Sequence, residues 1–442
     1  MFLFFWSFRH TQKSSLFLPF LFRLNYWAME RTIAIIDLKS FYASCECVAR
    51  HLDPFKTPLV CCDPYRSDSS VVMSASPYLK MKYDIPNVCR RRDLPKVPGM
   101  IFATPRMSYY LELSSKVLAT FLEFVAYQDI HVYSVDEAFL NIGPYLPLAK
   151  ESPESFVFKI QKRIYEKYGL TATAGIGPNP FLAKIALDQE GKKKPPYQAH
   201  WTMKDVPTKL WKIQPINKIW GIGSQTEKRL ASIGIRDMEA LAKADDSLLL
   251  NIFGILGLEL KSLARGIDES DIRKPYIPSD VSFSLGQTLI APRSLKDSLL
   301  LFKEMNDDLS ERLREAKSQT GLVHVWIGYH EDLPYSHQET LPFPTSDSEL
   351  LYRAIEKAIL RGAHEGLIQG IGISYGKLKK DEGSIQLSLF EKSEEQLRRM
   401  NLQKAIDDIH KVYGKNSVLR ASSLLERSTA KRRHEQIGGH RE

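Results

Sequence analysis

Two apolar segments of the chain carry carboxylates where a strand is expected. The isoleucine-rich run Thr32–Ile36 predicts a buried strand, with Asp37 at its end. Strand-like runs at Ile130–Val135 and Ala138–Ile142 flank Asp136–Glu137. Carboxylates beside buried strands are costly unless something compensates them. A divalent cation is one compensation, and solvation in a turn is the alternative.

The spacing of Asp136 and Glu137 adds a condition. Neighbouring residues of a strand point to opposite faces. Both carboxylates therefore face one site only if a turn or bulge lies there. Two metal ions at such a site would stabilise the attacking and leaving oxygens of a phosphoryl transfer.

The surrounding pattern predicts several domains. Strands alternate with amphipathic helices up to a linker-like run at residues 191–196, which indicates an α/β or α+β core. Residues 51–100 are rich in turn signals, and residues 200–275 are mostly helical. A second α+β unit is expected at 283–380, with strands at Phe283–Ile290, Leu322–Tyr329 and Leu367–Tyr375 and helices at Leu295–Lys317 and Ser348–Arg361.

The composition fits a nucleic-acid partner without requiring one. The chain has 442 residues, a formal net charge of +9 and a pI of about 9.0. Its five cysteines lack zinc-site spacing and are expected to be reduced core residues. The apolar residues 1–28 read as upstream sequence before a working start at Met29, and a membrane anchor is the alternative.

Four segments of the chain closely resemble the Y-family DNA polymerases. They occur in the family's order, and the resemblance covers about residues 30–390. YASCE and ATPRMSYYLELS favour the UmuC-like branch of Gram-positive bacteria and their mobile elements. The four segments are IAIIDLKSFYASCE (Ile33–Glu46), YSVDEAF (Tyr133–Phe139), TAGIGPNPFLAKIA (Thr173–Ala186) and WGIGSQTEKRLASIGI (Trp220–Ile235).

The resemblance implies an α+β, multidomain right-hand polymerase. Its palm has a mixed sheet plus helices, its fingers are small, its thumb carries a helix-hairpin-helix, and its little finger is α+β. The expected bounds are 29–40 and 105–192 for the palm, 41–104 for the fingers, 193–275 for the thumb, 276–282 for a linker, 283–380 for the little finger and 381–442 for a flexible tail with nascent helix near Glu394–Tyr413.

The resemblance also implies the catalytic residues. Asp37, Asp136 and Glu137 match the family's metal ligands, together with the carbonyl of Leu38. The cofactors would be two Mg²⁺ ions. One ion would lower the pKa of the primer 3′-hydroxyl, and the other would hold the dNTP triphosphate.

Other matched positions concern the incoming nucleotide. Phe41 and Tyr42 match the aromatic pair beneath the sugar, with Tyr42 as the steric gate against ribose. Tyr78 and Lys184 match residues that contact the triphosphate. The family often has arginine where this chain has Met81, so that Lys80 or Lys82 is expected to supply the charge. Glu46 is expected to be structural.

DNA and clamp contacts are implied further along the chain. Gly221, Ile222 and Gly223 match a helix-hairpin-helix turn whose N–H groups meet DNA phosphate. The tail segment Gln386, Leu387, Ser388, Leu389, Phe390 is close to the pentapeptide with which bacterial polymerases bind the sliding clamp.

The resemblance implies a low-fidelity translesion DNA polymerase that works in DNA repair, SOS mutagenesis and the response to DNA damage. We expect a cytoplasmic, nucleoid-associated monomer that binds primer–template DNA and dNTPs, with a RecA or UmuD-like accessory protein as a further candidate partner. Three alternatives remain: a catalytically silent, clamp-bound scaffold of the same family, a nucleotidyl cyclase on a palm-like fold, and a plain DNA-binding module.

Overall fold

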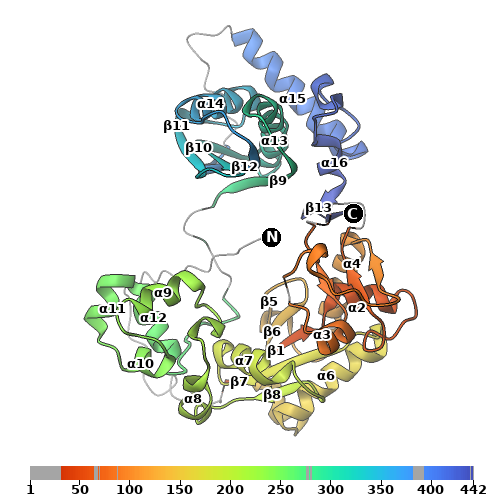
Figure 1. Ribbon diagram of the computed structural model, residues 1–442, viewed down its shortest axis with the longest axis vertical. Coiled ribbons are helices and arrows are strands. Elements are labelled where there is room, and N and C mark those ends of the chain that lie inside the picture. Colours follow the sequence, from red (N-terminus) through yellow and green to blue (C-terminus); the bar gives the residue numbers. More distant parts are fainter. Residues whose placement is uncertain are drawn as a thin grey trace. The chain divides into compact units, whose positions relative to one another are not determined.

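The computed structural model describes residues 31–63, 68, 70–86, 88–274, 278, 281–381, 393–438 and 440–441. The chain forms two compact units that divide between Pro275 and Tyr276, and each is described by itself (Figure 1). The expected upstream sequence 1–28 and the expected clamp peptide 386–390 lie outside the described residues. No helix among those residues is long and apolar enough to cross a membrane.

A five-stranded sheet forms the centre of the first unit, in the order β5-β6-β1-β7-β8. The middle strand β1 pairs antiparallel with β6 and β7, and all six of its residues are buried. This burial explains its continuous apolar sequence. The strands are β1 (Ile33–Leu38), β5 (Ile130–Val132), β6 (Glu137–Asn141), β7 (Ala172–Gly177) and β8 (Gln198–His200).

Helix α7 (Pro180–Ala186) packs closely against β7 and β1. A β-carbon at Gly175 would lie 2.0 Å from the carbonyl oxygen of Ala183, so only glycine permits this approach. Helices α4 (Met107–Phe121) and α6 (Pro153–Tyr168) pack against each other in the same unit. The alternation of strands and helices expected from the sequence is confirmed here.

The prediction that the chain leaves this sheet through a linker at residues 191–196 is wrong, because one more strand of the sheet follows that run. The chain leaves α7 through a π-helical turn (Leu187–Gly191) and then adds β8 parallel to β7. A β-carbon at Gly191 would lie 2.4 Å from the carbonyl oxygen of Ala174, so the chain crosses tightly against the sheet. Strand β8 escaped prediction because its three residues, Gln198-Ala199-His200, form no apolar run.

The loop-rich segment after β1 is confirmed, with a small three-stranded sheet in the order β3-β2-β4. All five cysteines are buried and free, as expected. Burial raises the pKa of each thiol. The elements are α2 (Phe41–Val48), β2 (Leu59–Cys61), β3 (Ser74–Ala75), α3 (Pro77–Tyr83) and β4 (Ile101–Ala103).

The expected helical region is confirmed after β8. Its helices share a hydrophobic core that includes Trp201, Leu230 and Leu241. The helices are α8 (Asp205–Thr208), α9 (Ser224–Ala231), α10 (Met238–Lys243), α11 (Asp246–Phe253) and α12 (Ile255–Ala264).

The second unit holds an antiparallel sheet in the order β11-β10-β12-β9, with α13 and α14 packed on it. The expected strands and helices are confirmed, but β11 was missed. Strand β11 is a sheet edge, where its two prolines are tolerated. The elements are β9 (Phe283–Arg293), α13 (Leu295–Glu315), β10 (Ser318–Tyr329), β11 (Tyr335–Thr345), α14 (Ser348–Leu360) and β12 (Ile368–Lys380).

The prediction of a flexible tail over 381–442 is wrong for its described part. The nascent helix expected near Glu394–Tyr413 is a full helix, α15 (Ser393–Tyr413), and α16 (Ala430–His434) packs on α13. We call residues 393–438 the C-terminal segment. Its charged composition suggested solvent exposure, but those charges pair with carboxylates of the second unit, as at Arg433–Asp308 and Arg420–Asp307.

Candidate active site

The sheet register places two of the predicted carboxylates side by side. Asp37 of β1 lies directly opposite Glu137 of β6, and Thr173 of β7 lies on its other side. The Thr173 hydroxyl donates a hydrogen bond to Asp37 Oδ1 at 3.2 Å. Asp37 is only 7% exposed, so its charge depends on what the protein places around it.

Asp136 lies in the turn that precedes β6, which satisfies the condition set by the sequence. The backbone N–H groups of Tyr133 and Ser134 both donate to the carbonyl of Glu137, and the Ser134 hydroxyl donates to Asp136 Oδ1 at 2.7 Å. Leu38 N–H donates to the carbonyl of Asp136 at 2.9 Å, which ties the turn to β1.

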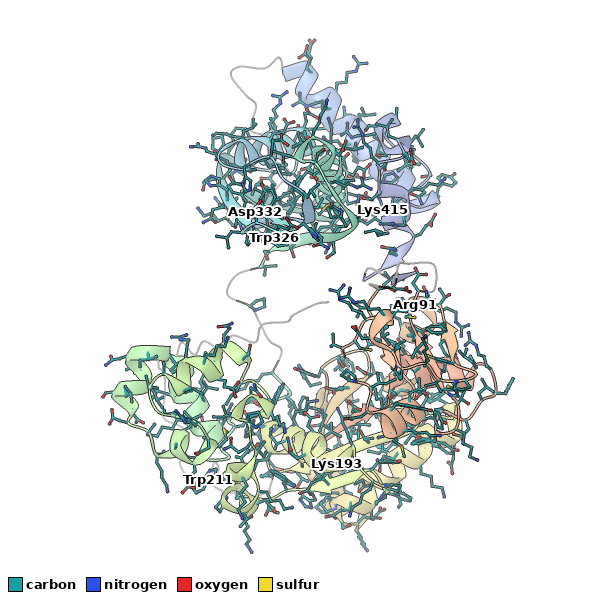
Figure 2. All side chains as sticks on the ribbon, viewed as in Figure 1. Arg91, Lys193, Trp211, Trp326, Asp332 and Lys415 are labelled. Atoms are coloured by element: carbon teal, nitrogen blue, oxygen red, sulfur yellow. The ribbon has the colours of Figure 1, made fainter. Side chains whose placement is uncertain are left out.

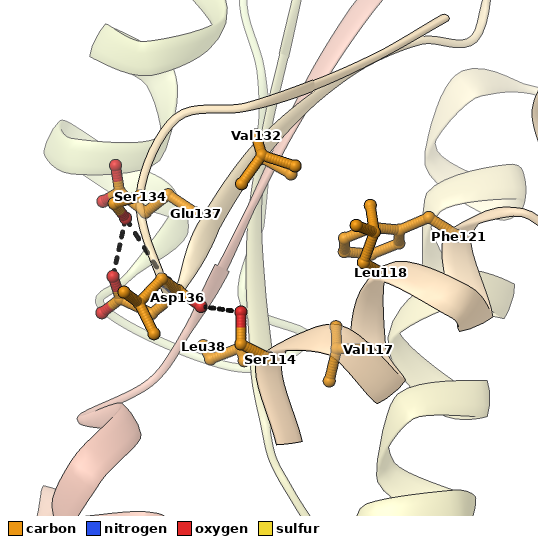
Figure 3. A pocket seen from close by; sticks show the side chains of 11 residues that line it. Leu38, Ser114, Val117, Leu118, Phe121, Val132, Ser134, Asp136 and Glu137 are labelled. Carbon is orange, nitrogen blue, oxygen red and sulfur yellow. Dashed lines mark hydrogen bonds between the residues drawn. The ribbon is translucent and has the colours of Figure 1, made fainter. Parts of the chain in front are cut away.

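A small hollow lies behind this turn, lined by α4, β5 and the turn itself (Figure 3). The Ser114 hydroxyl of α4 donates to the carbonyl of Val135 at 2.6 Å. On the α4 side the hollow is lined by apolar side chains such as Val117 and Phe121, and on the other side by the turn with Asp136. Helix α4 therefore braces the acidic turn from its apolar side.

Two lysines hold the carboxylates together. Lys184 Nζ lies 2.8 and 3.0 Å from the two carboxylate oxygens of Glu137. Lys192 Nζ lies 2.9 Å from Asp37 Oδ2, 3.6 Å from Glu137 Oε1 and 3.1 Å from Asp188 Oδ1. Lys184 was predicted at the site. The sequence analysis did not place Lys192 or Asp188 at the site. The one signal for Lys192 was the basic run after Gly191, and that run resembled a linker.

The electrostatics show an excess of buried negative charge. Burial raises the pKa of Asp37 to about 7, with its hydrogen bond to Glu137 adding to the shift and Lys192 opposing it. Although burial opposes the change, contacts with Asp37, Lys184 and Lys192 lower the pKa of Glu137 to about 2. Asp37 is therefore the member of the pair whose charged form burial disfavours, and a bound cation would favour that charged form.

The donor set fits a divalent metal ion. Carboxylate and carbonyl oxygens are the ligands that Mg²⁺ prefers, and the strand register places the carboxylates of Asp37 and Glu137 side by side. In the described part of the chain, however, no three His, Cys, Asp or Glu side chains are gathered closely enough to surround an ion. Lys192 would therefore have to leave Asp37 for an ion to bind.

The predicted nucleotide-contacting aromatics pack beside the acidic turn. The Tyr42 ring lies 5.4 Å from that of Phe41 and 5.0 Å from that of Tyr110, measured between centroids. Burial raises the pKa of Tyr42 to about 12, and the nearby charge of Asp136 adds to the shift. Tyr42 is thus close to the carboxylates. Glu46 is structural, as expected, because its buried carboxylate accepts hydrogen bonds from Arg106 and Tyr110.

The structure separates the lysines of α3. Lys82 Nζ donates to the Tyr78 hydroxyl at 3.1 Å and stays at the surface. Lys80 is more buried: burial lowers its pKa, and the charges of Asp37 and Asp136 oppose the change. Lys80 therefore lies within electrostatic reach of Asp37 and Asp136, whereas Tyr78 contacts its own helix and packs against the small hydrophobic core that includes Val60.

The predicted glycine turn lies in the helical region, at the start of α9. Gly221 has φ +90°, which favours glycine, and Gly223 caps α9, while the Ile222 side chain is buried. A β-carbon on either glycine would meet no atom within 4 Å, so the backbone is open to a ligand. Trp220 Nε1 donates to the Tyr133 hydroxyl at 3.2 Å, which joins this region to the acidic turn.

Comparisons with known proteins identify the class of this fold and site. The sequence model of the impB/mucB/samB family matches residues 36–188, that of its C-terminal domain matches 283–389, and that of the IMS family HHH motif matches 204–235. The chain belongs to this family, the Y-family DNA polymerases.

Individual relatives agree with this assignment. A Bacillus subtilis (strain 168) protein named for UV-damage repair, UvrX, is 32% identical over 93% of this chain and 98% of its own length. DNA polymerase IV 2 of the same organism is 29% identical over 93% of this chain and 99% of its own length. A Y-family DNA polymerase chimera of Dbh and Dpo4 shares the fold, with a TM-score of 0.63 and 21% identity over 79% of this chain and 99% of that one.

The family assignment confirms the coarse predictions. The protein is a DNA-directed DNA polymerase with a translesion or repair role, and it carries a helix-hairpin-helix and a little-finger domain. Its partners include primer–template DNA and dNTPs. These findings argue against a cyclase or a plain DNA-binding module.

Proposed function

We propose that this polymerase is a low-fidelity translesion enzyme that uses Asp37, Asp136, Glu137 and the carbonyl of Leu38 to hold two Mg²⁺ ions. The supporting observation is the strand register that places the carboxylates of Asp37 and Glu137 side by side, with Asp136 in the adjoining turn. When bound, the ions would neutralise the dNTP triphosphate and lower the pKa of the primer 3′-hydroxyl.

The chain's own residues have distinct parts in this proposal. Asp37 would hold an ion as its carboxylate, with the charge of the ion in place of that of Lys192, and Lys184 would keep Glu137 oriented or turn to the triphosphate. Lys80 of α3 lies within electrostatic reach of the carboxylates and is a better candidate for the missing positive charge than the surface residue Lys82. The open backbone at Gly221–Gly223 meets a DNA phosphate.

The experiment that tests this proposal is primer extension by the full chain with Mg²⁺, all four dNTPs, and undamaged or abasic templates. Asp136→Asn should abolish extension on both templates and leave primer–template affinity within about two-fold. Asp129→Asn is the control variant. It removes a carboxylate of the same unit that accepts hydrogen bonds from Asn141 and Arg273. Extension by the Asp136 variant at the parental rate would refute the metal-ligand assignment. The alternative, a silent scaffold, predicts no extension by the parent protein even with a loaded clamp.

The ring of Tyr42 is proposed as the steric gate, since it packs on Phe41 and Tyr110 near the carboxylates. Tyr42→Ala should raise the use of ribonucleotides relative to deoxyribonucleotides. Unchanged selectivity would place the gate elsewhere.

The segment Gln386, Leu387, Leu389, Phe390 is proposed to recruit the sliding clamp, on the sequence resemblance alone. Replacing Leu389 and Phe390 with alanine should abolish clamp binding and leave distributive synthesis intact. Retained clamp affinity would rule out this peptide. A RecA or UmuD-like partner would show itself as stimulation of bypass.

A further inference from the structure

Trp220 packs against two hydrophobic cores of the first unit at once. One is the core of the helical region, which α7 also joins, and the other is a core of the central sheet that includes Ile35 and Phe139. Trp211, by comparison, packs within the helical region, where its indole N–H donates to the carbonyl of Ala264 at 2.8 Å (Figure 2). Trp220 therefore connects the helices to the sheet.

Three aromatic rings meet at this connection, and we call Trp220, Tyr133 and Phe139 the aromatic joint. The Trp220 ring lies 5.8 Å from that of Tyr133 and 6.1 Å from that of Phe139, measured between centroids. Tyr133 and Phe139 meet edge to face at 5.8 Å. The indole N–H donates to the Tyr133 hydroxyl at 3.2 Å. Rings that pack edge to face fix each other's orientation, and the hydrogen bond fixes the direction of the indole.

Both ring partners of Trp220 lie close in the chain to the proposed metal ligands. Phe139 follows Glu137 by two residues on β6, the strand that is paired with β1. Tyr133 lies at the start of the acidic turn, and its backbone N–H donates to the carbonyl of Glu137 at 3.0 Å. The indole therefore contacts residues on both sides of Asp136 and Glu137.

The residue that follows Trp220 begins the turn that is proposed to meet a DNA phosphate. Gly221 has φ +90° and Gly223 caps α9, while the buried side chain of Ile222 anchors the turn between them. Because the peptide unit is planar, the backbone at Trp220 fixes where the N–H group of Gly221 lies. The indole is thus attached directly to the phosphate-binding turn.

Other contacts hold the helical region on the sheet. The Asn179 side chain donates to the carbonyl of Gly266 at 2.8 Å, and Arg273 Nε lies 2.7 Å from Asp129 Oδ1. Both contacts involve the chain after α12, far along the sequence from the glycine turn. A substitution at Trp220 should therefore leave the helical region attached and change the place of the phosphate-binding turn.

We propose that Trp220 is a positioning residue that holds the turn Gly221–Gly223, with the DNA phosphate it binds, in a fixed place relative to Asp136 and Glu137. Nucleotide incorporation requires the primer end to be placed closely, and a misplacement of about 1 Å can lower a rate about 100-fold. This inference rests on the polymerase activity and on the proposed phosphate contact, and it adds a residue that acts through both.

The test measures single-turnover nucleotide incorporation and the affinity for primer–template duplex, both with the full-length protein. Trp220→Leu removes the ring and the N–H group, Trp220→Phe keeps a ring, and Tyr133→Phe removes only the hydroxyl that accepts the hydrogen bond. Trp211→Leu is the matched control, since it removes a hydrogen-bonded indole from the same helical region. Thermal unfolding of each variant reports its loss of stability.

For Trp220→Leu we expect the incorporation rate at saturating dNTP and duplex to fall at least about ten-fold, while the dissociation constant of the duplex changes by less than about two-fold. Trp211→Leu should lose similar thermal stability and keep its rate within about two-fold of the parent. Trp220→Phe and Tyr133→Phe should each slow incorporation less than Trp220→Leu. Their double variant should be no slower than the slower single variant, since both substitutions remove the same hydrogen bond.

Three results would overturn the proposal. The first is an unchanged rate in Trp220→Leu. The second is an equal loss in Trp211→Leu, which would mean that any weakening of the helical region slows the enzyme. The third is a loss that saturating duplex restores, which would place the effect in DNA binding alone.

The same assays separate this inference from the proposed function. Asp136→Asn should abolish incorporation, whereas Trp220→Leu should only slow it. Normal incorporation by Asp136→Asn beside a slow Trp220→Leu would reject the metal-ligand assignment and keep the aromatic joint, and the reverse result would reject the joint alone. Gly223→Asp places a carboxylate at the N-cap of α9 and should weaken duplex binding by repelling the phosphate. Unchanged duplex affinity in that variant would reject the phosphate contact.

Discussion

Buried carboxylates meet basic side chains in both units, but with opposite electrostatic outcomes. In the first unit, burial raises the pKa of Asp37 although Lys192 contacts it. In the second unit, a row of carboxylates on α13 faces the C-terminal segment, and there the pKa of Asp308 is lowered.

Asp308 shows the second arrangement most clearly. Its carboxylate oxygens lie 2.7 Å from Arg433 Nε and 2.7 Å from His434 Nε2. Although burial opposes the change, these two contacts lower the pKa of Asp308. One helical turn earlier, Glu304 accepts hydrogen bonds from the backbone N–H groups of Thr429 and Ala430 at 3.1 Å each. We call this set of contacts between α13 and the C-terminal segment the fastener.

The comparison teaches that an ion pair alone does not set the pKa of a buried carboxylate. At Asp308 two partners stabilise the charged form of the carboxylate, so its pKa falls, whereas at the neighbouring Asp307 burial outweighs the contact with Arg420 and the pKa rises. A site that awaits a cation leaves negative charge uncompensated, so the pKa of one carboxylate rises. Asp37 shows the rise and Asp308 shows the fall.

The largest expected difference concerns activity. Glu137→Gln should lower the rate of nucleotide incorporation by at least about 1000-fold, equivalent to ~4 kcal/mol in the barrier. Glu304→Gln is the matched control, since it is also a buried glutamate but serves the fastener. It should change the rate by less than about two-fold. Single-turnover incorporation measures the rate of each variant. Similar losses of rate in the two variants would mean that Glu137 has no special part in catalysis.

The next effect concerns the stability of the C-terminal segment. Asp308→Asn leaves Arg433 and His434 facing a neutral amide, which should cost about 3 kcal/mol, as for other broken buried pairs. Hydrogen exchange should show lost protection in α15 and α16 but not in β1. The Asp136→Asn variant should leave α15 and α16 protected. Full protection of α15 and α16 in the Asp308 variant would show that this carboxylate does not hold the C-terminal segment in place.

The smallest expected effect is the pH dependence of stability, and its sign differs between the regions. In metal-free protein, Asp37 has a pKa near 7 against an ordinary 3.8, so the folded state loses stability as the pH rises from about 4 to 7. Asp308 has a lowered pKa, so its contribution is present at neutral pH and is lost as the pH falls below about 4.

Asp37→Asn should therefore stabilise the metal-free first unit at pH 8, by about 1–2 kcal/mol once the opposing contact with Lys192 is allowed for. The gain should vanish near pH 4. Calorimetry with a chelator present measures it, and Mg²⁺ should reverse the ranking of variant and parent. A variant that is less stable than its parent at pH 8 without metal would show that Asp37 is not an uncompensated carboxylate.

Much of the fold followed from local patterns. The isoleucine run of β1 and the amphipathic periods of α4, α13 and α14 were visible in the sequence, because each depends on residues close together in the chain. The turn at Asp136 was only a condition for both carboxylates to face one site. Strands β8 and β11 were missed because a sheet edge needs no apolar run. The C-terminal segment was mistaken for a flexible tail because charged residues look alike whether they meet water or opposite charges.

The amino-acid sequence by itself determined the α+β class, the polymerase family and the three carboxylates, since these depend on short segments in a particular order. Only the tertiary structure decided that Lys192 closes the acidic site, that α13 fastens the C-terminal segment, and that Trp220 joins the helical region to the acidic turn. The physical reason is the same in all three cases. Each contact joins side chains or backbone that strand register and helix packing bring together, and no local pattern in the chain records that distance.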